Sequence, residues 1–259
     1  MRKSVSGNTT GRDLLEESRG FLRELVRRKG LAGARISVQV GVLSPEEAIG
    51  RPQRQDFPLL LGREVMVEAR LGDARGQVFT SAPAEYSGPV GDIVALDISD
   101  PRSRTIFAAT LNAVLRACGL IEGTVHCRNE EPELCAAELA RRLMRDGIAK
   151  VGLVGLQPAF LEALARSLGP ERVRVTDLNP RNIGTLRYGI KVWDGDKRNG
   201  ELAQWADLLV ITGSSIVSGT FAPLEAELRR LKRRFVLYGV SAAAVCKIFN
   251  IPRFCIYGH

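Results

Sequence analysis

Apolar and polar residues follow different spacings along the first part of the chain. Residues 11–29 repeat apolar side chains at near-helical spacing and are followed by Gly30, which predicts an amphipathic helix. Residues 35–43 alternate apolar and polar side chains, which predicts a strand with one buried face. Residues 64–71 and 77–81 predict two more strands, joined by the glycine-rich turn between them.

Helices follow these strands. Residues 92–98 form one more apolar run in the strand-rich stretch. Asp100-Pro101 then predicts a helix start, because a capping carboxylate followed by proline in the first turn is favoured there. This helix is expected to run to about Ala117, and another to cover residues 132–145. Strands followed by helices predict an α+β domain over residues 1–120.

From about Ile148 the pattern changes to short apolar runs that alternate with helical stretches. The predicted strands are residues 150–156, 172–177, 207–212, 235–239 and 253–257. The predicted helices are residues 158–168, a stretch near 200–205, 224–233 and 242–249. This alternation predicts a mostly parallel sheet with crossover helices, hence a Rossmann-like domain over residues 148–259. Residues 121–147 are expected to connect the two domains.

Length and composition are those of an ordinary globular protein. The chain has 259 residues, of which 45% are hydrophobic and 25% charged, so it can bury a core without disulfides or a structural metal. We find no export signal and no membrane-spanning run, and the five cysteines are irregularly spaced. We therefore expect a cytoplasmic protein with reduced thiols; a homo-oligomer is left open.

The formal net charge of +8 leaves two interpretations open. Basic residues cluster at positions 27–29, 141–142 and 229–234. Such clusters occur in modules that bind nucleic acid or other polyanions, but they also occur on solvated helix faces. Because no nucleic-acid motif accompanies them and aromatic residues make up only 6%, we do not expect nucleic acid as a partner.

Two predicted strands of the second domain end in residues typical of ligand sites. Gly155 lies in the first strand-to-helix turn, although the full dinucleotide fingerprint is absent. Asp177 ends the next strand, about 20 residues on, where a carboxylate that binds ribose commonly lies. Asp177 and Asn179 precede Pro180, so a turn stabilised by their side chains explains them equally well.

Small hydroxyl residues and glycines follow the next two strands. The loop of residues 212–220 contains Thr212, Gly213 and Thr220, which allow hydroxyl contacts and close approach of the backbone to a ligand. Thr220 could instead serve only as a helix cap. Ser241 follows the strand after that. Since the carboxyl ends of parallel strands share one edge, we expect one cleft there, with backbone N–H groups turned toward it.

His126-Cys127 is a pair of soft metal ligands near the connecting helix, with Glu131 close by in sequence. No C-x-x-C pair accompanies it, and neighbouring residues of a strand point to opposite faces, so a structural zinc site is not expected. A packed, hydrogen-bonded pair is the alternative to a ligand set. No Walker loop, nucleophile elbow or H-E-x-x-H motif is present, so the sequence indicates no particular reaction.

Taken together, several short motifs resemble a known family, the putative heavy-metal chelation proteins. They are Thr110-Leu-Asn112-Ala113, Gly123-Thr-Val-His126-Cys127, Asp177-Leu-Asn179-Pro180 and Thr212-Gly213 with Gly219-Thr220. The resemblance implies an N-terminal domain like that of enolase, a Rossmann-like second domain and a functional cleft between them. In this family a proline often precedes the serine that corresponds to Ser241, and here Val240 stands in its place.

The leading hypothesis is therefore a cleft that binds a metal, such as a transition metal, or a metal-chelating small molecule. The expected metal ligands are His126, Cys127 and Glu131. The polar end of the ligand is expected to contact Asn112, Gly155, Asp177, Asn179, Thr212, Gly213, Thr220 and Ser241. An enzyme that binds a nucleotide or S-adenosylmethionine, in the manner of a transferase, is one alternative. A non-catalytic module that binds polyanions through residues 224–234 is the other.

Overall fold

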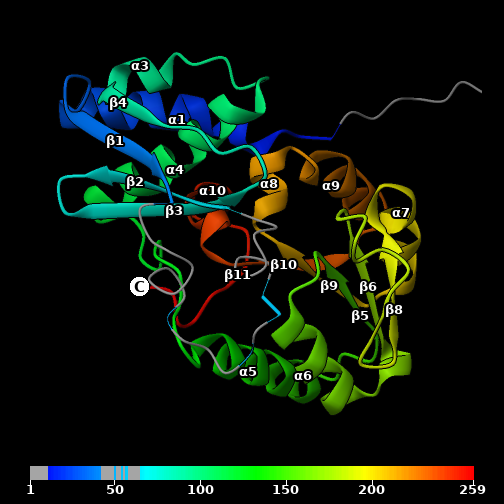
Figure 1. The fold of residues 1–259 in the computed structure, drawn as a ribbon. Coiled ribbons are helices and arrows are strands. Elements are labelled where there is room, and N and C mark those ends of the chain that lie inside the picture. Colours follow the sequence, from blue (N-terminus) through cyan, green and yellow to red (C-terminus); the bar gives the residue numbers. More distant parts are fainter. Residues whose placement is uncertain (1–10, 42–49, 51–53, 55, 58–64) are drawn as a thin grey trace, which may run out of the picture.

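Two β-sheets, each with its own helices, make up the protein (Figure 1). The computed structural model describes residues 11–41, 50, 54, 56–57 and 65–259. The end of the strand predicted over residues 35–43 and the start of the one predicted from residue 64 lie outside these residues. The mixed α/β fold and the largely parallel second sheet are confirmed. The division into domains stays a prediction.

The first sheet has four antiparallel strands in the order β3-β2-β1-β4. They are β1 (Arg35–Val40), β2 (Val65–Leu71), β3 (Ala74–Thr80) and β4 (Tyr86–Pro89). Helix α1 (Leu14–Lys29) begins where the Asp13 carboxylate accepts the N–H groups of Leu15 and Glu16, and it ends at the left-handed Gly30. Helix α4 (Pro101–Ala117) begins where Asp100 accepts the N–H of Ser103, as predicted.

Two predictions for this part were wrong. Leu71 pairs with Ala74, so the turn between β2 and β3 has only two residues and the strand starts earlier than predicted. The apolar run over residues 92–98 begins inside a short helix, α3 (Val90–Val94). Its buried residues, Val90, Ile93 and Val94, are spaced for one helix face, and a run this short does not distinguish helix from strand.

The second sheet has the strand order β11-β10-β9-β5-β6-β8-β7, and every pairing except that of β7 with β8 is parallel. Its strands are β5 (Val151–Val154), β6 (Val173–Asp177), β7 (Leu186–Arg187), β8 (Ile190–Asp194), β9 (Leu208–Thr212), β10 (Arg234–Tyr238) and β11 (Arg253–Phe254). The sequence patterns missed β7 and β8, which are short and have mostly exposed or half-buried side chains on the outer edge.

Helices cover both faces of this sheet (Figure 1). They are α5 (Glu131–Arg145) and α6 (Pro158–Leu168) on one face, and α7 (Gly195–Trp205), α9 (Phe221–Arg230) and α10 (Ala243–Phe249) on the other. The sequence patterns missed α8 (Ser214–Ser218), a short helix inside the loop predicted over residues 212–220. None of the described helices combines the length and the apolar character needed to cross a membrane.

The two sheets share a hydrophobic core. One cluster of buried side chains contains Leu111 and Val114 of α4 together with Val217 of α8 and Val245 of α10. A second cluster lies on the opposite face of the parallel sheet, under α5 and α6. Burial of apolar surface therefore fixes the two parts of the chain against each other, which keeps the edge of the first sheet next to the carboxyl ends of the parallel strands.

Asn112 joins the two parts through hydrogen bonds. Its side chain is 1% exposed. Nδ2 donates to the carbonyls of Gln77 in β3 and Val240 after β10, at 3.2 and 3.1 Å, and Oδ1 accepts the N–H of Ala244 at 2.9 Å. Because the protein uses both Nδ2 hydrogens and one hydrogen bond to Oδ1, Asn112 holds the fold together, and it is not among the described residues that line the cavity at the carboxyl ends of the parallel strands. Its predicted contact with a ligand stays a prediction.

We expect Asn112→Ala to lower the free energy of unfolding by about 2–4 kcal/mol, because it leaves two carbonyls and one N–H buried without partners. Urea denaturation measures this loss. Thr110→Val on the same helix is the matched control: the Thr110 hydroxyl is buried without a hydrogen-bond partner, so its removal should not destabilise. Equal effects of the two changes would contradict this assignment.

Candidate functional site

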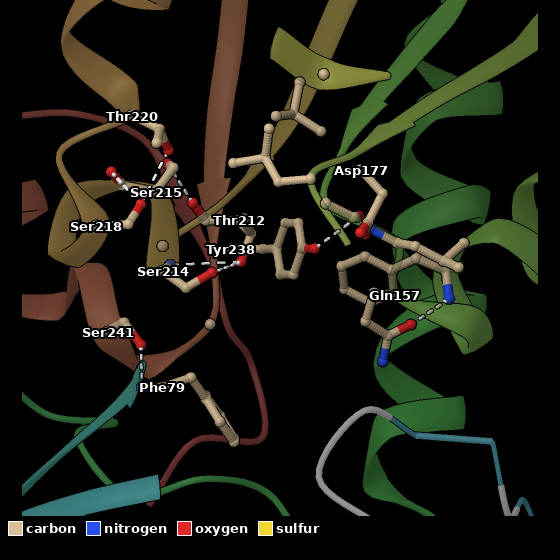
Figure 2. A pocket seen from close by; sticks show the side chains of 18 of the residues that line it. Phe79, Gln157, Asp177, Thr212, Ser214, Ser215, Ser218, Thr220, Tyr238 and Ser241 are labelled. Carbon is tan, nitrogen blue, oxygen red and sulfur yellow. Dashed lines mark hydrogen bonds between the residues drawn. The ribbon is translucent and has the colours of Figure 1, made fainter. Parts of the chain in front are cut away.

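A cavity of about 540 Å³ lies where the first sheet meets the carboxyl ends of the parallel strands. Residues from β3, the segment before α5, and the ends of β5, β6, β9 and β10 border it (Figure 2). Of the predicted ligand-binding and metal-binding residues, nine line this cavity: His126, Cys127, Gly155, Asp177, Asn179, Thr212, Gly213, Thr220 and Ser241. The structure thus brings together residues from both parts of the chain.

Hydroxyl groups form one wall of the cavity (Figure 2). Thr212 Oγ1 lies 3.0 Å from Ser214 Oγ, and Ser215 Oγ donates to the Thr212 carbonyl at 2.6 Å. Ser218 and Thr220 form a second pair at 2.9 Å. Thr220 stands directly before α9, but its side chain makes no capping hydrogen bond, so its hydroxyl is not used as a helix cap.

The first strand-to-helix turn is closed by its own hydrogen bonds. Gly155 has a φ of 85°, and a Cβ there would lie 2.7 Å from Thr212 Cγ2, so glycine is required. The N–H of Gly155 donates to the Thr176 carbonyl, and that of Leu156 donates to Asp177. The N–H of Phe160, in the first turn of α6, donates to Gln157. This turn therefore presents fewer N–H groups to a ligand than predicted.

Asp177 stabilises a turn through its side chain, which was the predicted alternative to a role in binding ribose. Its Oδ1 accepts the N–H of Asn179 at 2.7 Å, and its Oδ2 accepts the N–H of Leu156 at 2.7 Å. Asn179 in turn accepts the N–H of Arg181 at 3.0 Å. Both side chains line the cavity, but each already stabilises the local backbone.

His126 is held from two sides. Its backbone N–H donates to Gln77 Oε1 at 2.7 Å, and Gln77 Nε2 donates to the buried carboxylate of Glu68 at 2.6 Å. The imidazole packs edge-on against Phe79, with ring centres 5.0 Å apart. The backbone around His126 is not a strand, so both His126 and Cys127 line the cavity; the expectation of opposite faces was wrong.

The protein environment keeps the two soft donors uncharged. Burial lowers the pKa of His126 to about 4, and burial raises the pKa of the Cys127 thiol. His126 Nδ1 lies 2.6 Å from the Cys127 carbonyl, which can only accept, so Nδ1 carries the proton. Nε2 of the neutral ring then has a free lone pair, 4.0 Å from Cys127 Sγ.

Glu131 is not among the described residues that line the cavity, although its charge acts on both His126 and Cys127. Its predicted role as a metal ligand stays a prediction. Its Oε2 accepts the Arg128 N–H at 2.6 Å and lies 3.0 Å from His259 Nε2. As the first residue of α5, Glu131 turns back over the preceding loop. Within the described part of the chain, no three His, Cys, Asp or Glu side chains are placed to hold one metal ion.

Aromatic residues that the sequence patterns did not single out complete the cavity. Tyr238, at the end of β10, donates its hydroxyl to the Gly155 carbonyl at 3.1 Å. It packs against Phe160 with ring centres 4.9 Å apart, and Phe79 and Phe254 also line the cavity. In the sequence these aromatics occur within apolar runs and are indistinguishable from core residues. The position of Tyr238 directly before Gly239 was the only available signal.

The comparisons with known proteins agree with this fold. Residues 139–251 match the family model described as DUF364, putative heavy-metal chelation. No curated protein matches the chain. The fold is similar to that of a DUF364 protein of unknown function from Pyrococcus horikoshii, at 17% sequence identity and a TM-score of 0.52, covering 88% of this chain and 80% of that one.

A DUF364 protein of unknown function from Desulfitobacterium hafniense is similar at 16% identity and a TM-score of 0.50, covering 71% of this chain and 72% of that one. At these identities the likeness concerns the fold alone. The family resemblance predicted from the sequence is thereby confirmed. Residues 139–251 of this chain match the model of the DUF364 family of putative heavy-metal chelation proteins.

Proposed function

We propose that the cavity binds a metal-chelating small molecule, and that a metal enters it as part of that chelate. The observation that supports this most is the position of His126 and Cys127 on the same cavity as the hydroxyl wall of residues 212–220. The cavity volume of about 540 Å³ lies in the range of sites for organic ligands, roughly 300–1,000 Å³. A bare ion needs far less space.

The donor set argues against a metal held by the protein alone. His126 Nε2 and Cys127 Sγ lie 4.0 Å apart, a spacing that two ligands of one ion can adopt. A closed site needs about four ligands, and no third His, Cys, Asp or Glu joins this pair among the described residues. The remaining ligands would have to come from the bound molecule, while Thr212, Ser214 and Ser218 contact its polar groups.

The two alternatives lose support from the same structure. For a nucleotide, the N–H groups of Gly155, Leu156 and Phe160 would be the expected phosphate donors, but they are bound within the protein. For a polyanion, the basic helix α9 would need outward-facing free charge. Arg229 and Arg230 are exposed but pair with glutamates of their own helix, which offsets part of their charge, while Lys232 and Arg234 lie exposed after the helix.

We expect His126→Ala to weaken binding of the neutral nickel–iminodiacetate complex by about tenfold or more. Iminodiacetate leaves coordination positions of nickel open for Nε2, and loss of even an outer-shell partner of a ligand commonly costs roughly 10–100-fold. Isothermal titration calorimetry measures this binding. Nickel chloride alone should bind more weakly than the complex, because the bare ion lacks the chelator's contacts with the hydroxyl wall of the cavity.

His259→Ala is the matched control, because His126 and His259 are the only histidines in the chain. His259 does not line the cavity, and its side chain is 55% exposed. Binding that depends on His259 and not on His126 would be surface binding and would contradict the proposal. Equal, weak binding of the complex by wild type and His126→Ala would contradict it as well.

The low pKa of His126 also predicts a dependence of stability on pH. Unfolded His126 takes up a proton near pH 6.5, whereas the folded ring stays neutral down to about pH 4. Since the unfolded state binds more protons between these values, His126 should lower the free energy of unfolding as the pH falls from 6.5 to 4. Urea denaturation at several pH values, compared with His126→Gln, isolates this effect. A constant difference between the two proteins across this window would be evidence against it.

A further inference from the structure

The charge of the cavity wall is unlike that of the chain as a whole. The chain contains 37 lysines and arginines and has a formal net charge of +8. None of the described residues that line the cavity is a lysine, an arginine or a glutamate, and Asp177 is their only carboxylate. The described wall thus has a formal charge of −1.

Several backbone N–H groups of the wall are not free to bind an anion either. Helix N-termini and glycine-rich loops usually bind anions through free backbone N–H groups. Here the N–H of Leu156 already donates to Asp177, that of Phe160 to Gln157, and that of Gly213 to the Tyr238 carbonyl. Pro158, the first residue of α6, has no N–H at all.

Aromatic rings face the same space. Phe160 and Tyr238 pack against each other, and both line the cavity. In Figure 2 the Tyr238 ring points toward Asp177, and Phe79 lies below Ser241. The faces of such rings carry partial negative charge and attract cations, more strongly where water is excluded. The carboxylate and the aromatic rings therefore both favour a cation over an anion in this cavity.

We infer that this cavity selects compounds of zero or positive net charge and rejects polyanions such as nucleoside di- and triphosphates. This inference rests on the proposed function, since it assumes that small molecules enter the cavity. It narrows the proposed ligands to neutral or cationic organic molecules. Metal chelates are included when the negative charge of the chelating molecule does not exceed the positive charge of the metal. An anion there would meet Asp177 without any lysine or arginine among the described lining residues.

The experiment measures the electrostatic preference directly, without knowledge of the natural ligand. Ser214→Cys places a thiol on the hydroxyl wall, with little change in size. The variant is treated with three methanethiosulfonates that differ in charge: methyl, trimethylammonium-ethyl and sulfonato-ethyl. Peptide mass spectrometry follows modification at position 214, and the native Cys118, which does not line the cavity, serves as the reference thiol in the same sample.

We compare the ratio of the cationic reagent's rate to the anionic reagent's rate at the two thiols. We expect this ratio to be about tenfold higher at position 214 than at Cys118, because electric fields focused in clefts commonly change rates by this much. Adding Asp177→Asn should reduce this preference. An anionic reagent that reacts as fast as the cationic one would overturn the inference and leave the proposed function standing. If even the neutral methyl reagent fails to react at position 214, small molecules do not enter, and both proposals fail.

Discussion

A single buried amide determines how the two walls of the cavity face each other. Asn112 donates to the carbonyls of Gln77 and Val240. Gln77 then fixes His126, since its side-chain oxygen accepts the N–H of that residue. Val240 precedes Ser241, whose hydroxyl accepts the N–H of Phe79. The positions of His126, Cys127 and Ser241 thus depend on a side chain that is not among the described residues lining the cavity. Leaving its partners unpaired in the core would cost more than most surface contacts contribute.

Arg104 of α4 fixes the hydroxyl wall in the same way. Its guanidinium is buried and donates to the carbonyls of Ile216 and Val217 at the end of α8, and it pairs with Asp13 at the start of α1. A cation at the carboxyl end of a helix is favoured by the helix dipole, and the pairing with Asp13 offsets part of the cost of burying its charge. The loop that presents the hydroxyls is therefore held by helices of the first part of the chain.

The sequence allowed prediction of features that depend on local spacing, and missed those that depend on distant contacts. Helix α4 was predicted closely because Asp100 and Pro101 define its start, and α6 because its apolar spacing and flanking residues are unambiguous. The carboxyl ends of parallel strands lie at one edge of the sheet, and this rule was sufficient to place Asp177 and residues 212–220 near one cavity. The motif containing Asn112 pointed to an important residue, but its structural role could not be predicted, because its hydrogen-bond partners lie 35 to 132 positions away. The contacts of Glu131 with Arg128 and His259 could not be predicted either, since nearness in sequence does not fix side-chain direction at a helix start.

The contrast between a basic chain and a cavity whose described lining residues include no lysine or arginine has a structural cause. Long cationic side chains are placed on helix surfaces, where their charged ends remain hydrated and pair with glutamates three or four positions away, as Arg141 and Arg142 do with Glu138. Hydroxyl and amide groups can instead line a partly buried cavity, because they satisfy one another, as Thr212 and Ser214 do. The net charge therefore describes the outer surface of this protein. What can enter its cavity is decided by a few neutral groups, one carboxylate and the aromatic rings around them.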